Sequence, residues 1–149
     1  MGNGMVSDLA GNLDASGVLA GQYDRKIGRN RLLTIPAGWV ACLGESKSVF
    51  VMPDPHERSL NIMPSSCLES EMGRIRSNAR NDKETLNALR VIATMCEQVV
   101  MDGQHRIRIS DRLLEFAGIA DNAVLLGKGR SIKVRSPEAM ESGTFKRAT

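Results

Sequence analysis

The chain has 149 residues, enough for one domain or for two small similar units that share a core. Aromatic residues make up only 3% of it, which argues against a nucleic-acid surface that stacks bases on several rings. The formal net charge of +3 is too small for a general polyanion coat, so the placement of cations matters more than their number.

The first 20 residues lack the features of a secretory signal. They carry no basic segment, and Asp8 and Asp14 interrupt their apolar residues, so we expect residues 1–20 to form a flexible leader. No apolar run approaches the length of a membrane span, which argues against a membrane partner. The three cysteines are widely spaced and include no C-x-x-C pair. We therefore expect small hydrophobic side chains in a reduced cytoplasm, with no disulfide, metal or cofactor.

Cations gather in two segments. The first cluster comprises Arg25, Lys26, Arg29 and Arg31, and the second comprises Lys128, Arg130, Lys133 and Arg135. No acid interrupts the second cluster. Because such clusters are more often solvated faces than binding sites, charge alone predicts a solvated surface for both.

A repeat runs through the chain. Residues 26–52 and 100–126 share their apolar pattern at a constant offset of 74 residues, without a gap. Each unit predicts a basic turn, a short strand, a helix of about two turns that ends at Gly44 or Gly118, and two further strands. Pro36 suits the first turn of one helix, and Ser110 is a good N-cap for the other.

A helical stretch separates the two units. Residues 81–84 predict a helix start, and the apolar positions that follow recur at close to helical spacing. These positions are Leu86, Leu89, Ala93, Cys96 and Val100. The polar and basic segment before them, 74–83, is either a solvated linker or a second contact surface. We divide the chain into a leader (1–20), a first repeat (21–72), a connecting helix (73–98), a second repeat (99–140) and a flexible tail (141–149).

The motifs of both units resemble those of a known family. "GQY" followed by "LTIPAGW" opens the first unit, and the second reads "MDGQHRIRISDRLLEFAGIADNAVLLGKGRSIKV". Over residues 21–140 this combination resembles the MraZ family, whose repeats carry an Asp-x-x-Gly-Arg turn, a Leu-Arg helix ending in Ala-Gly and a Val-x-Leu-x-Gly hairpin. The resemblance implies an α+β, mainly β fold. The fold implied by the resemblance is a two-repeat AbrB-like swapped-hairpin β-barrel with added helices, assembled into a ring-shaped homo-oligomer.

The same resemblance implies a function. MraZ proteins are transcription regulators that bind short direct repeats in double-stranded DNA, upstream of the cell-division and cell-wall gene cluster. It therefore implies a cytoplasmic, nucleoid-associated DNA-binding protein that is not an enzyme and has no small-molecule substrate. In that family the Arg of each turn faces DNA, which predicts a reading loop in each repeat. The candidate DNA-binding residues are Arg29, Asn30 and Arg31 in the first turn, and Gln104, His105 and Arg106 in the second.

The two turns depart from the family pattern. In the second, His105 stands where the family has Gly, which demands a positive φ that costs Gly nothing. In the first, the segment "GRNRL" places Gly28 at the Asp position and Leu32 at the Arg position. Arg29 and Arg31 retain positive charge in this turn, but at positions other than those of the family's basic residues. Taken without the resemblance, Arg106 and Arg108 around Ile107 favour a half-exposed strand with solvated arginines, and the resemblance reverses this for Arg106 more than for Arg108.

Other classes of protein fit the residues less well. His56 and His105, the only histidines, have no nucleophile or metal ligand at a readable spacing, and "GKGR" from Gly127 lacks the second half of a P-loop. The alternatives left open are a ring-forming protein-interaction scaffold and an antitoxin-like protein with weak or lost DNA specificity. The tail "ESGTFKRAT" is short for wrapping a partner.

Overall fold

A computed structural model describes residues 18–44, 46–79 and 82–142. The strands are β1 (Gln22–Lys26), β2 (Leu32–Thr34), β3 (Ser48–Pro53), β4 (Leu60–Pro64), β5 (Glu97–Val100), β6 (Arg106–Arg108), β7 (Asn122–Gly127) and β8 (Ile132–Arg135). The α-helices are α2 (Ala37–Val40), α3 (Leu68–Ala79), α4 (Lys83–Met95), α5 (Asp111–Ala117) and α6 (Pro137–Ser142). Short 3-10 turns are η1 (Arg29–Arg31), η2 (Ala41–Leu43) and η3 (Ser65–Cys67). None of the described helices is long and apolar enough to span a membrane.

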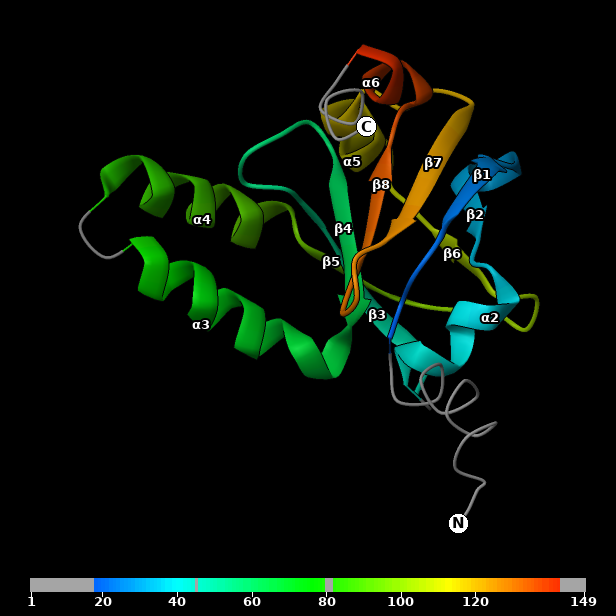
Figure 1. Cartoon of the computed structure of the whole chain (residues 1–149), viewed down its shortest axis with the longest axis horizontal. Helices are drawn as coiled ribbons and strands as arrows, with labels where there is room; N and C mark the ends of the chain where they lie inside the picture. Colours follow the sequence, from blue (N-terminus) through cyan, green and yellow to red (C-terminus); the bar gives the residue numbers. More distant parts are fainter. Residues whose placement is uncertain (1–17, 45, 80–81, 143–149) are drawn as a thin grey trace.

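Both repeats contribute strands to one sheet, and they exchange their first strands. Six strands pair in the antiparallel order β1-β7-β8-β4-β3-β5, and β2 pairs with β6 in a separate ribbon (Figure 1). The first strand of each repeat thus joins the third strand of the other, while β4 pairs with β8 and β2 with β6. Equivalent strands of the two repeats are therefore related by an approximate twofold axis.

The expected antiparallel α+β architecture is present, with two differences. The fold is mixed and not mainly β, because α3 and α4 form a long helix pair beside the sheet (Figure 1). The described strands do not close into a barrel, because β2 and β6 form strand pairs only with each other and leave β1 and β5 as sheet edges.

The predicted repeat is confirmed. Strands β6 and β7 begin and end 74 residues after β2 and β3. The predicted helix ends are also confirmed, since Gly44 and Gly118 follow their helices at φ 96° and 69°, where a glycine is free of steric strain. Ser110 holds the N-cap position, but its hydroxyl donates to Glu97 Oε2 at 2.9 Å and makes no capping bond.

The connecting segment differs from the single helix expected over 73–98. Two helices, α3 and α4, lie side by side there (Figure 1). A new helix starts because the Asp82 side chain accepts a hydrogen bond from the Glu84 backbone nitrogen. The apolar stripe ends with that helix, and Val100 lies in strand β5 with 68% of its surface exposed.

Part of the expected leader is folded. Leu19 is buried within the main core, and its backbone pairs with Gly129 through hydrogen bonds of 2.9 and 2.7 Å. The rest of the leader, residues 1–17, lies outside the described residues. So does the tail beyond residue 142, whereas helix α6 includes residues 141 and 142.

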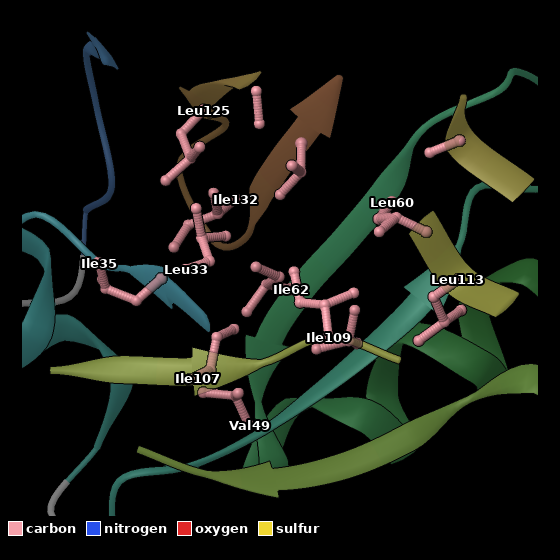
Figure 2. Packing of buried hydrophobic residues seen from close by; sticks show 14 of the residues in the cluster. Leu33, Ile35, Val49, Leu60, Ile62, Ile107, Ile109, Leu113, Leu125 and Ile132 are labelled. Atoms are coloured by element: carbon pink, nitrogen blue, oxygen red, sulfur yellow. The ribbon is translucent and has the colours of Figure 1, made fainter. Parts of the chain in front are cut away.

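The main core is shared by both repeats. Its buried side chains, several of them equivalent in the two repeats, are shown in Figure 2 and include Leu33, Ile35, Val49, Leu60, Ile62, Ile107, Ile109, Leu113, Leu125 and Ile132. A second, smaller core lies between the helix pair and the sheet, where Met52 and Met63 meet Leu89 and Ile92. Because β2 and β6 turn Leu33 and Ile107 inward, their alternate residues face outward.

The second basic cluster is not a solvated face throughout. Lys133 and Arg135 are each only 7% exposed. Lys133 Nζ lies 2.6 Å from Asp54 Oδ2 and 2.9 Å from Glu57 Oε2, and Arg135 Nη2 lies 2.9 Å from Glu57 Oε2. The β3–β4 loop of the first repeat thus supplies the counter-charges for β8 of the second.

These ion pairs favour the ionised forms of Asp54 and Glu57. Burial disfavours the charged form of Asp54, but hydrogen bonds from Lys133, the His56 backbone and Asn61 outweigh it and lower the pKa. The pKa of Glu57 is lowered against burial in the same way, by Lys133 and Arg135. An acid whose pKa falls on folding adds stability above its unfolded pKa, and this contribution is lost as the pH falls through the folded pKa.

We predict that Lys133→Met lowers the free energy of unfolding by about 3 kcal/mol at pH 7, because it leaves two partly buried carboxylates without their shared cation. The deficit should narrow as the pH is lowered from about 5 to 3, since protonated acids need no cation. Urea unfolding across this pH series measures both effects. Lys128→Met, which removes an exposed lysine of the same hairpin, is the control. A loss of unfolding free energy in Lys133→Met that does not change with pH would contradict the ion pairing of Lys133 with Asp54 and Glu57.

Candidate nucleic-acid interface

The β2–β6 ribbon holds the two predicted turns at its opposite ends. Its antiparallel register places Thr34 opposite Arg106 and Leu32 opposite Arg108, all on the outer face. Each turn also binds the strand end of the other repeat. Ile35 N donates to the His105 carbonyl at 2.8 Å, and Ile109 N donates to the Arg31 carbonyl at 3.0 Å. The position of each turn therefore depends on both repeats.

Asp102 organises the second turn. Its Oδ1 accepts hydrogen bonds from the backbone nitrogens of Gln104 and Arg106, both at 2.9 Å. Its Oδ2 accepts one from Arg106 Nε at 2.8 Å. The pKa of Asp102 is lowered, first by the hydrogen bond from the Arg106 backbone. Within the described residues the Nη groups of Arg106 make no hydrogen bond, so the guanidinium is oriented with two donor groups still available.

His105 takes the backbone conformation that the sequence predicts. Its φ is 64°, in the left-handed region that favours glycine. The side chain is half-buried, whereas Gln104 at the tip of the turn is exposed. Both residues lie beyond the end of β2, away from the first turn.

The first turn keeps the closing backbone hydrogen bond of the second turn but lacks its acid. Gly28 N donates to the Leu32 carbonyl at 2.8 Å, as Asp102 N does to the Arg106 carbonyl at 2.9 Å. Asn30 and Arg31 both have positive φ, 60° and 62°. The Arg31 guanidinium binds both carboxylate oxygens of Asp111, and its Nη2 lies 3.0 Å from Oδ2. This contact lowers the pKa of Asp111.

A basic hollow of about 350 Å³ lies between the first turn and Arg106. Its lining consists of Lys26, Gly28, Arg29, Asn30, Leu32, Thr34 and Arg106, with no carboxylate among them. The structure thus brings together three of the predicted residues, Arg29, Asn30 and Arg106. It does not bring Arg31, Gln104 or His105 to this hollow.

Sequence reasoning did not select Lys26 and Thr34 for the site. The basic character of the segment around Lys26 was a usable signal, but Thr34 gave none, because only its pairing with Arg106 places it at the hollow. The hollow can hold an anion, and its guanidinium, amide and hydroxyl groups can hydrogen-bond phosphates or base edges. Among the described residues no group of His, Cys, Asp and Glu is arranged to hold a metal ion.

Comparison with known proteins finds similar transcriptional regulators. No protein-family model matches it. The transcriptional regulator MraZ of Leuconostoc citreum is 28% identical, over 86% of this chain and 87% of its own length. The transcriptional regulator MraZ of Roseiflexus castenholzii is also 28% identical, over 82% and 83%, and that of Mycoplasma mobile is 29% identical, over 83% of each chain.

Over most of its length the chain is similar to these transcriptional regulators, all of them named MraZ. The family resemblance predicted from the turn and helix motifs is thereby confirmed. These relatives are named as regulators of transcription, which agrees with the expectation that the protein is not an enzyme. Within the MraZ pattern, His105 and Arg31 both occupy the glycine position of their turns, and both have the positive φ that glycine would adopt freely.

We predict that His105→Gly stabilises the protein by about 1 kcal/mol, because a left-handed conformation costs a non-glycine residue this much or more. Thermal or urea unfolding measures the change. Gln104→Gly is the matched control, since Gln104 does not have a positive φ and a glycine there only adds freedom to the unfolded chain. Equal or lower stability of His105→Gly would show that the turn relaxes without strain.

Proposed function

We propose that the protein is a transcription regulator that binds double-stranded DNA through the outer face of the β2–β6 ribbon. The observation that carries this proposal is the acid-free hollow where Lys26, Arg29 and Arg106 meet. Asp102 pairs with Arg106 through Nε, but no carboxylate lines the hollow itself, and three cations around such a space favour a polyanion. The similarity of the chain to transcriptional regulators named MraZ supports the same function.

The residues of this face differ in their proposed roles. Arg106 reads bases, because Asp102 holds its Nε and leaves the Nη groups for hydrogen bonds with O6 and N7 of guanine. Lys26 and Arg29 neutralise phosphates, which adds affinity without sequence preference. Asn30 and Gln104 supply amides at the two turns, and His105 shapes the second.

The finer features implied by the family belong to the same proposal. We propose that the repeats at 21–72 and 99–140 form an AbrB-like swapped-hairpin unit, which the exchange of first strands between repeats supports. Copies of the chain then assemble into a ring-shaped homo-oligomer that binds short direct repeats of nucleoid DNA, upstream of the cell-division and cell-wall gene cluster. One turn binds weakly, but a ring makes later contacts intramolecular and so suits tandem repeats.

The test is fluorescence anisotropy with a duplex from the protein's own upstream DNA and a scrambled duplex of equal length, across a salt series. Tight binding that prefers the native duplex and weakens steeply with salt is the expected result. Equal, weak binding to both duplexes would contradict the proposal. A ring-forming interaction scaffold or an antitoxin-like protein would then be the better description.

We predict that Arg106→Ala weakens binding to the native duplex by about 1–3 kcal/mol while binding to the scrambled duplex changes less. Lys26→Ala should weaken binding to both duplexes about equally, because it removes a phosphate contact. The slope of log K against log salt should fall by about 1. Arg76→Ala, an exposed arginine on α3, is the control for lost charge. An Arg106→Ala protein that binds like the wild type would remove this residue from the mechanism.

A further inference from the structure

An acid from the second repeat holds the arginine of the first turn. Asp111 is the first residue of α5 and lies 80 positions from Arg31 in the chain. Both oxygens of its carboxylate accept hydrogen bonds from the Arg31 guanidinium, through Nε and Nη2. The two side chains are 46% and 65% exposed, so this pair lies at the surface, next to the ribbon.

The second turn has no equivalent of this pair. By the 74-residue offset, His105 corresponds to Arg31 and Ala37 corresponds to Asp111, so neither partner is charged in the same way. The acid of the second turn, Asp102, contacts only Nε of its arginine and leaves Nη1 and Nη2 open. The two turns share a closing backbone hydrogen bond but differ in which arginine donors they leave free.

The surroundings of Arg31 are acidic. Arg31 does not line the basic hollow but a separate one, together with Asp111, Glu115 and Asp121. To contact a DNA phosphate, Arg31 would have to give up a two-point, charge-assisted contact. It would also leave an unpaired carboxylate close to the phosphate, where like charges repel.

We infer that Asp111 keeps Arg31 away from DNA, so that only the second turn reads bases and the first contributes Arg29 and Asn30. This inference rests on the proposed function and refines it. Asp111 is a specificity-determining residue in this assignment, because it decides which arginines reach the duplex. A surface ion pair contributes little to stability, so its removal should leave the fold intact.

The experiment measures binding of the native upstream duplex across a salt series for four proteins with equal unfolding midpoints. Asp111→Asn should bind up to about fivefold more tightly than the wild type. Its plot of log K against log salt should steepen by about 0.9, because one more cation meets a phosphate. Glu115→Gln removes the same charge from the same helix without freeing Arg31, and should show little of this gain.

The double variant Arg31→Gln/Asp111→Asn gives the sharpest comparison, because its net charge equals that of the wild type. We expect it to bind with the wild-type affinity and salt slope, since neither protein offers Arg31 to DNA. Weaker binding with a slope reduced by about 0.9 would show that Arg31 already contacts DNA, and would overturn the inference. A gain in Asp111→Asn that survives in the double variant, or that Glu115→Gln matches, would also overturn it.

Failure of the inference is separable from failure of the proposed function. If Arg106→Ala weakens binding and the double variant weakens it too, only the inference is wrong. If the wild type shows no preference for its upstream duplex and Arg106→Ala binds equally well, the proposed function fails and the inference fails with it.

Discussion

The pairing of β2 with β6 determines which side chains enter the core and which form the candidate DNA-binding face. Because side chains alternate along a strand, one register sends Leu33 and Ile107 into the core and Thr34 and Arg106 outward. A slip of one residue would bury arginines and expose the apolar residues, so burial fixes which groups face solvent. The antiparallel direction then sets each turn against the end of the other repeat's strand, where backbone hydrogen bonds hold it.

Helix α5 is held by the first repeat at both ends. Arg31 binds Asp111 at its start, and Arg58 donates to the carbonyls of Phe116 and Glu115 at its end, at 3.2 and 3.4 Å. Arg58 belongs to the same β3–β4 loop whose acids pair with Lys133 and Arg135. Since unsatisfied carbonyls end every helix, the Arg58 contacts stabilise α5 as well as locate it. Strand exchange, ion cluster and helix contacts therefore all tie the repeats to each other.

Local features of this fold were predictable from the sequence, and long-range partners were not. The constant offset predicted β6, β7 and the helix ends at Gly44 and Gly118, because apolar spacing and glycine conformation act over a few residues. The same spacing cannot say which strand pairs with which, so the exchange of first strands was not predictable. Nor could it show that Lys133 is buried, since its partner Asp54 lies 79 residues away. The basic hollow likewise depends on the β2–β6 register.

The two turns also differ in what their acids do for the backbone. Asp102 accepts two backbone hydrogen bonds as well as the arginine, so the shape of the second turn and the orientation of Arg106 depend on one side chain. Asp111 accepts only side-chain donors from the first turn, whose shape is kept by Gly28 and two left-handed residues. The orientation of the arginine and the shape of the turn are therefore coupled in the second turn and separate in the first. A change at Asp111 can alter which arginine is free without unmaking a turn, whereas a change at Asp102 cannot.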